Sequence, residues 1–346
     1  MTILQAIVLG LVEGITEYLP VSSTGHLILA SWLLGLAEDP ARKAAVDSFN
    51  IIIQGGAILA VLGLYRARVA LMLRGLAGAP EARAGRELFV KLVVAFLPAA
   101  VLGVLLDDWI EERLFHPTPV LIALGGGGLI LLVLSRWIGT LTAREANERD
   151  DFSNFPYRAA LAVGFMQCLA MWPGTSRSMV TILGGILFGL SPRRAAEFSF
   201  LLGLPTLGGA CVYKLAKGLK AGPEAFIDAL GGPLPIAVGI AVAAVSAALA
   251  IKWLVGYLSR GGFAAFGWWR VVVAALLAAG IATGHVTLCL PRDGRPKPCD
   301  PRGQSSAYEP LTGSPSAGLN FSTSVSTLRR VSSGLSPMPT TPSSSK

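Results

Sequence analysis

Six apolar stretches constrain this chain more than any other feature, because each can cross the roughly 30 Å hydrocarbon core of a bilayer as a helix with some tilt. The 346 residues are 53% hydrophobic and only 14% charged, a composition too apolar for a soluble protein of this size. We therefore predict an all-α polytopic membrane protein. The six predicted transmembrane helices cover about residues 49–65, 89–106, 118–138, 195–213, 234–257 and 270–290.

The net charge of +8 does not indicate nucleic-acid binding, because the lysines and arginines fall in short loops between the apolar stretches and form no basic face with interleaved aromatics. The positive-inside rule explains them better. It places the arginine-rich loop 66–91 in the cytoplasm and the acidic loop 107–112 outside. Lys214, Lys217 and Lys220 then fall outside, against the rule.

A polar segment, EGITEYLPVSSTGH, interrupts the apolar N-terminus from Glu13 to His26. Glu13 and Glu17 are four residues apart, so on a helix they share a face and repel each other, and we expect a cation beside them. Pro20 ends the helix. The hydroxyls and main-chain N–H groups that follow can hold an anion, with His26 as acid, base or nucleophile. The hydroxyls are those of Ser22, Ser23 and Thr24.

A second polar segment, PGTSRS, begins at Pro173. Arg177 is suited to fork-like binding of phosphate oxygens, and the N–H groups that open a helix after Gly174 add a positive dipole end. Alternatively, the Arg177 side chain could extend to the membrane–water interface while the hydroxyl groups only cap the helix. The predicted phosphate-binding set is Gly174, Thr175, Ser176, Arg177, Ser178 and Thr181.

The two polar segments belong to a weak internal repeat. In each, a proline precedes a serine by three residues, and a Gly-Gly pair at 55–56 is echoed at 208–209. Each copy contains one broken segment and three transmembrane helices. Because three is odd, the copies must have opposite orientations, with the broken segments meeting near the membrane midplane. We predict one membrane domain over residues 1–290, with repeats at about 1–138 and 157–290 and two re-entrant broken-helix segments.

The composition changes after about residue 290. Serine, threonine and proline fill 24 of the 46 positions from 301 to 346, too many for the segment to bury enough apolar surface to order itself. We predict a disordered tail over residues 291–346.

The two polar motifs together resemble those of the bacterial undecaprenyl-diphosphate phosphatases of the bacitracin-resistance (BacA) type. The first is Glu13-x-x-x-Glu17 followed by LPVSSTGH at 19–26, and the second is PGTSRS-x-x-T at 173–181. The resemblance covers about residues 1–290. It implies an inverted-repeat helical bundle in the inner membrane. The implied activity is removal of the terminal phosphate from the polyprenyl diphosphate carrier of cell-wall synthesis, at a site that opens to the periplasm.

For this reaction we expect Glu13 and Glu17 to hold a divalent cation, Mg²⁺ or Ca²⁺, while Arg177 neutralises the phosphoryl group. Ser23 is the predicted nucleophile and His26 its activating base, with direct attack by His26 or by a metal-bound water as open alternatives. The expected partners are the polyprenyl diphosphate lipid and the membrane, and a homodimer is an alternative to a single-chain unit.

Three other functions compete with this one. An inverted-repeat secondary transporter or polyprenyl-phosphate flippase would share the broken helices and buried carboxylates. A type-2 phosphatidic acid phosphatase would carry a second catalytic histidine where this chain has Leu183. A lipid-binding scaffold without catalysis would leave Arg177 and its neighbouring hydroxyls unexplained.

Overall fold

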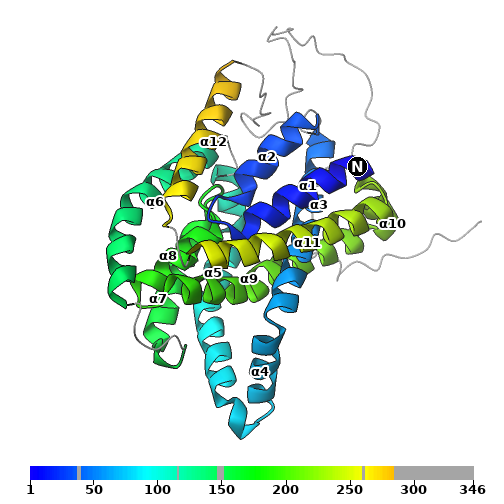
Figure 1. Cartoon of the computed structure of the whole chain (residues 1–346). Coiled ribbons are helices and arrows are strands. Elements are labelled where there is room, and N and C mark those ends of the chain that lie inside the picture. Colours follow the sequence, from blue (N-terminus) through cyan, green and yellow to red (C-terminus); the bar gives the residue numbers. More distant parts are fainter. Residues whose placement is uncertain (37–39, 115–116, 146–151, 259–261, 284–346) are drawn as a thin grey trace, which may run out of the picture. The chain divides into compact units, whose positions relative to one another are not determined.

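The computed structural model describes residues 1–36, 40–114, 117–145, 152–258 and 262–283, and within these ranges it contains helices and their connections but no strand (Figure 1). The predicted tail at 291–346 and the end of the sixth predicted transmembrane helix lie outside the described residues. The helices are α1 (Ile3–Tyr18), α2 (Ser23–Leu33), α3 (Pro40–Leu64), α4 (Arg66–Leu76), α5 (Arg83–Leu114), α6 (Pro117–Glu145), α7 (Tyr157–Cys168), α8 (Arg177–Leu187), α9 (Pro192–Ala221), α10 (Pro223–Ala229), α11 (Pro233–Leu258) and α12 (Ala264–Ala282), with short 3₁₀ helices η1 (Pro80–Ala82), η2 (Phe152–Asn154) and η3 (Leu169–Met171).

Six of these helices are long and apolar enough to cross a membrane, which confirms the predicted number of transmembrane helices. Large apolar side chains such as Val104, Val133 and Leu249 are exposed on their outer faces, as expected for surfaces that contact lipid tails. The chain is therefore a multi-pass, all-α membrane protein. The six segments are Ala45–Leu64, Pro80–Leu106, Thr118–Arg136, Pro192–Lys220, Pro233–Leu258 and Ala264–Ala282.

The two polar segments form helix breaks with the same local geometry. Each break is followed by an 11-residue helix, α2 or α8. The residue before that helix has a left-handed φ, 73° at Ser22 and 75° at Ser176, and these are the only non-glycine residues with positive φ in the described part of the chain. A glycine with positive φ follows two residues after the end of each helix, Gly35 after α2 and Gly189 after α8. The structural correspondence thus pairs Ser22 with Ser176 and Ser23 with Arg177, one residue away from the register that the prolines suggest.

Each broken helix packs against a transmembrane helix from the other half of the chain. Helix α1 lies along α11, and α7 lies along α5. Both contacts depend on glycine, because a Cβ at Gly14 would collide with Ser246 Oγ, and a Cβ at Gly164 would lie 2.5 Å from the Ala95 carbonyl oxygen. The transmembrane helices α3 and α9 contact each other, as do α6 and α12. The opposite membrane orientation of the two halves stays a prediction.

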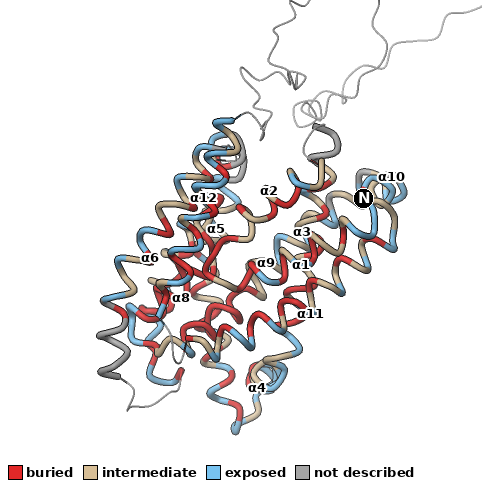
Figure 2. Tube along the Cα trace, turned by 45° about the horizontal axis from the view of Figure 1, so that its top comes forward, coloured by how far each residue is buried: buried red, intermediate tan, exposed pale blue. Residues whose placement is uncertain are grey.

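Helix α8 lies in the interior of this arrangement. Every residue from Ser178 to Ile186 is buried, whereas α6 and α12 expose much of their outer surface (Figure 2). Because α8 begins at the second polar break, its first turn is held inside the protein and brings Arg177 with it.

Candidate active site

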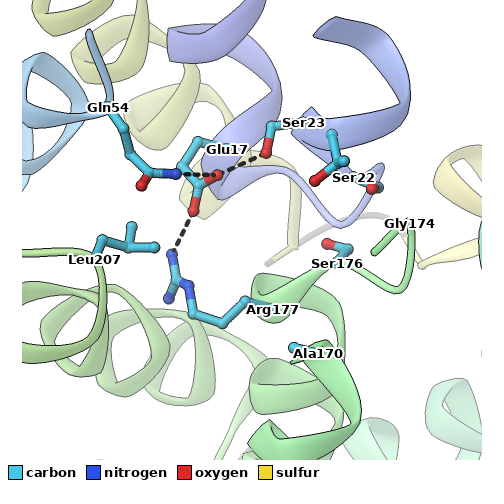
Figure 3. A pocket seen from close by; sticks show the side chains of 10 residues that line it. Glu17, Ser22, Ser23, Gln54, Ala170, Gly174, Ser176, Arg177 and Leu207 are labelled. Carbon is cyan, nitrogen blue, oxygen red and sulfur yellow. Dashed lines mark hydrogen bonds and ion pairs between the residues drawn. The ribbon is translucent and has the colours of Figure 1, made fainter. Parts of the chain in front are cut away.

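The two polar breaks meet at a small cavity of about 160 Å³ (Figure 3). The first break with the adjoining ends of α1 and α2 and the second break with the start of α8 supply most of its polar surface, and α3 and α9 each add one residue. Segments far apart in the sequence therefore contribute to one site. The lining residues are Glu17, Ser22, Ser23, Thr24, Gln54, Ala170, Gly174, Ser176, Arg177 and Leu207.

Glu17 is the centre of the hydrogen-bond network in this cavity. Its Oε2 accepts hydrogen bonds from Ser23 Oγ at 2.7 Å and from Gln54 Nε2 at 3.3 Å. Its Oε1 lies 3.1 Å from Arg177 Nη2 in an ion pair whose side chains are only 6% and 10% exposed. A buried carboxylate is stable when it is paired and hydrogen-bonded in this way. The arrangement places a hydroxyl, a carboxylate and a guanidinium within one small polar space (Figure 3).

Arg177 is oriented by helix α9. Its Nη1 donates to the Ser199 carbonyl oxygen at 2.8 Å, and its guanidinium lies 5.6 Å from the centre of the Tyr18 ring. The absence of a side chain at Gly203 gives it room, because a Cβ there would be only 3.1 Å from Nη1. Arg177 Nε is buried and has no hydrogen-bond partner among the described residues. The guanidinium is thus fixed in direction by Glu17, Ser199 and the Tyr18 ring.

Three of the hydroxyl groups predicted to bind phosphate have internal partners instead. Ser178 Oγ donates to the Leu19 carbonyl oxygen at 2.9 Å and so ties the second break to the end of α1. Thr181 Oγ1 donates to the Arg177 carbonyl oxygen at 2.8 Å. Ser176 Oγ accepts from the Met179 N–H at 3.3 Å and caps α8, although Ser176 also lines the cavity. Thr175, Ser178 and Thr181 do not line the cavity, and their role as substrate ligands stays a prediction.

His26 lies beside the cavity with both ring nitrogens occupied. Nδ1 is 2.7 Å from the Ser22 carbonyl oxygen. Nε2 accepts a hydrogen bond from Trp269 Nε1 at 2.7 Å, and the two ring planes are nearly parallel, 7° apart. The expected hydrogen bond between His26 and Ser23 is not formed, because His26 packs against α12 while the Ser23 hydroxyl points back to α1. The Ser23 hydroxyl donates to Glu17, and the role of His26 as activating base stays a prediction.

Glu13 is buried one helical turn before Glu17. It is 1% exposed, and its Oε1 has no hydrogen-bond partner among the described residues. A buried carboxylate oxygen without a partner is costly unless a proton or a cation satisfies it. Carboxylate oxygens are the ligands that Mg²⁺ and Ca²⁺ prefer, and Glu13 Oε1 is free to take this role. Glu13 does not line the cavity, and a cation at Glu17 would displace one of the donors that its oxygens now accept. No group of three or more potential metal-binding side chains occurs in the described part of the chain, so a substrate or water would have to complete the coordination.

Four contributors to the site, Gln54, Ala170, Ser199 and Leu207, were not assigned a role from the sequence. Gln54 is a polar residue inside an apolar helix, which is itself an indication of function, but nothing in the sequence identifies its partner. Ser199 contributes its main-chain carbonyl oxygen, which any residue at that position would carry. Leu207 is apolar within an apolar stretch and carries no such signal.

The fold and the cavity together define a polytopic, all-α membrane protein with a buried polar site suited to an anionic ligand. The family model described as "Bacitracin resistance protein BacA" matches residues 6–276, and the chain belongs to this family, which confirms the resemblance found in the two polar motifs.

Curated relatives carry the name undecaprenyl-diphosphatase. One from Cereibacter sphaeroides is 46% identical over 286 residues, which cover 82% of this chain and 98% of the relative. One from Rhodopseudomonas palustris is 43% identical over 283 residues, with coverage of 82% and 98%. One from Nitrosomonas europaea is 44% identical over 269 residues, with coverage of 78% and 91%.

Proposed function

We propose that this chain is a membrane phosphatase that hydrolyses undecaprenyl diphosphate to undecaprenyl phosphate and inorganic phosphate, and so recycles the lipid carrier of cell-wall synthesis. Membership of the BacA family and the shared name of its relatives support this function. The observation that carries it is the contact of the Ser23 hydroxyl with Glu17, which is itself paired with Arg177 inside a small polar cavity.

The reaction proceeds in two displacements. Ser23 Oγ attacks the terminal phosphorus as its proton passes to Glu17 Oε2, and the bond from that phosphorus to the bridging oxygen breaks, so that undecaprenyl phosphate leaves. Water then attacks the phosphoserine, the bond from phosphorus to Ser23 Oγ breaks, and inorganic phosphate leaves with the oxygen and protons of the water. Protonated Glu17 returns its proton to Ser23 Oγ and so restores the hydroxyl. The Ser23 hydroxyl already donates to Glu17 at 2.7 Å, within the range expected for proton transfer.

Arg177 stabilises the charge that develops on the phosphoryl oxygens. Its Nη2 lies 3.1 Å from a carboxylate oxygen, and a phosphoryl oxygen can replace that partner at a similar distance. Catalysis then rests mainly on positioning and electrostatic stabilisation, as in other phosphoryl transfers.

Glu13 and Glu17 would hold the divalent cation, Mg²⁺ or Ca²⁺. When bound, the cation would neutralise charge on the diphosphate oxygens. The unpartnered Glu13 Oε1 supports this assignment.

We place the enzyme in the bacterial inner membrane with the site open to the periplasm. The arginine-rich region around α4 supports this orientation, because positive loops favour the cytoplasmic side. The prenyl chain would lie between helices in contact with lipid, where only apolar surface is needed. A homodimer stays a prediction.

The test is phosphate release by the purified full-length protein in detergent, with undecaprenyl diphosphate as substrate and undecaprenyl monophosphate as control. We expect one inorganic phosphate from each diphosphate and none from the monophosphate. A transporter or flippase has no compartments to connect in detergent and would release no phosphate from either lipid. Absence of release in the presence of Mg²⁺ and Ca²⁺ would refute the proposed function.

A further inference from the structure

Arg270 of α12 is fully buried, at 0% exposed, and among the described residues it donates hydrogen bonds only to main-chain carbonyl oxygens. Nε donates to Leu124 at 3.1 Å, and Nη2 donates to Ala123 at 2.9 Å, both on α6. Nη2 also donates to Gly174 at 2.8 Å, and Nη1 donates to Thr175 at 3.1 Å. No carboxylate in the described part of the chain pairs with this guanidinium. A buried charge without a counter-ion is costly to keep, so its four contacts need an explanation beyond packing.

The contacts with Gly174 and Thr175 fix the turn that opens α8. In a planar trans peptide the carbonyl and the following N–H point in opposite directions. Because the Thr175 carbonyl points at Arg270, the Ser176 N–H points away from it. Among the described residues no main-chain carbonyl accepts a hydrogen bond from the Ser176 N–H. Gly174 and Ser176 both line the cavity (Figure 3), so this turn is held with its carbonyls toward Arg270 and a free N–H on the other side.

The same part of α12 contacts the first break. Trp269, the neighbour of Arg270, donates from Nε1 to His26 Nε2 at 2.7 Å, and His26 in turn contacts the Ser22 carbonyl oxygen. Two adjacent residues of α12 therefore each hold one of the two turns that form the cavity.

The glycine run in α6 leaves room for Arg270. A Cβ at Gly127 would lie 2.9 Å from Arg270 Cζ and would collide with Nη2. A Cβ at the preceding residue, Gly126, would meet nothing within 4 Å. One of these two neighbouring glycines is therefore required for the Arg270 contacts, and the other serves as its matched control.

We propose that Arg270 is a positioning residue for the phosphatase reaction: by holding the Gly174 and Thr175 carbonyls against α6, it directs the Ser176 N–H, and with it the start of α8, toward the phosphoryl group of the substrate. This inference rests on the proposed function. Arg270 does not touch the substrate and acts through the turn, whereas Arg177 on the first turn of α8 makes the direct contact.

The test compares Arg270→Lys, Gly127→Ala and Gly126→Ala in the full-length chain. Lysine keeps the charge, but its single nitrogen cannot reach carbonyls on both α6 and the turn. We expect Arg270→Lys to lower kcat by about 10- to 100-fold, the range expected when a catalytic group is displaced by a fraction of an ångström to 1 Å. The KM for the lipid should change by less than about threefold, because the lost interaction acts mainly in the transition state. Gly127→Ala should lower kcat in the same way, and Gly126→Ala should leave it unchanged.

All rates are normalised to the folded protein measured by size-exclusion chromatography. A purely structural role would reduce the folded fraction but leave kcat per folded molecule unchanged, and that result for Arg270→Lys or Gly127→Ala would overturn the inference. If neither variant folds while Gly126→Ala does, Arg270 is a structural residue and the inference is also overturned. A wild-type chain that releases no phosphate would refute the proposed function instead, so the two failures are distinguishable.

Discussion

Substitution of Arg177 by lysine tests whether a fork-shaped cation is needed in the cavity. In the structure the guanidinium uses one nitrogen to contact the Ser199 carbonyl at 2.8 Å and another to contact Glu17 at 3.1 Å. A lysine ammonium keeps the charge, but its single nitrogen cannot bridge both partners with the same geometry. At least one charge-assisted hydrogen bond is lost, and such a bond contributes about 1.5–3 kcal/mol. At about 1.36 kcal/mol for each tenfold change in rate, we expect kcat/KM to fall by about 10- to 150-fold.

The assay is phosphate release from undecaprenyl diphosphate by protein that has been shown to fold and insert into the membrane. Arg158→Lys is the matched control, because Arg158 is exposed on α7, away from the cavity residues, and we expect it to keep wild-type activity. Near wild-type turnover in Arg177→Lys would remove Arg177 from the site and refute this reasoning.

Three further predictions concern the cation, the tail and the packing of α1. Glu17→Gln should abolish phosphate release, and excess chelator should do the same to the wild type reversibly. Full activity of the wild type in excess chelator would refute the proposed role of a divalent cation, while the proposed role of Arg177 would stand. Truncation after residue 290 should leave activity and membrane insertion unchanged, and loss of either would show that the tail prediction is wrong. Gly14→Ala should lower the stability of the folded chain by about 1–3 kcal/mol through overpacking, because a Cβ there would collide with Ser246 on α11. Thermal unfolding measures this effect, with Gly63→Ala, where nothing lies within 4 Å of the added Cβ, as a control expected to be no less stable than wild type.

The fold class was predictable because apolar length alone decides which segments can cross a bilayer. All six predicted transmembrane segments begin within about ten residues of the segments found; the largest difference is at the second, predicted from residue 89 and found from Pro80. The meeting of the two polar breaks was also predictable, since buried charges in a membrane protein pair with one another, and Glu17 does pair with Arg177.

The partner of Ser23 was not predictable, because it depends on backbone conformation at a single residue. Ser22 adopts a left-handed φ, which the sequence does not predict for a serine. The chain direction set there turns the Ser23 hydroxyl toward Glu17, while His26 packs on Trp269. The contacts of Arg270 were hidden for a different reason. In the sequence Arg270 stands at the start of an apolar stretch, where it is expected to belong to a basic loop, but the structure buries it inside α12. Its acceptors are main-chain carbonyls, which every residue carries and no side chain identifies.

The most direct test of the proposed mechanism is to trap the phosphoryl group on the protein. Undecaprenyl diphosphate labelled in its terminal phosphate is mixed with the enzyme, quenched within milliseconds to seconds, and the acid stability of any protein-bound label is measured. Attack by Ser23 predicts a transient, acid-stable label on Ser23, which is absent from Ser23→Ala together with nearly all turnover. An acid-labile, base-stable label on His26, or phosphate release with no protein-bound label at any time, would contradict Ser23 as the nucleophile.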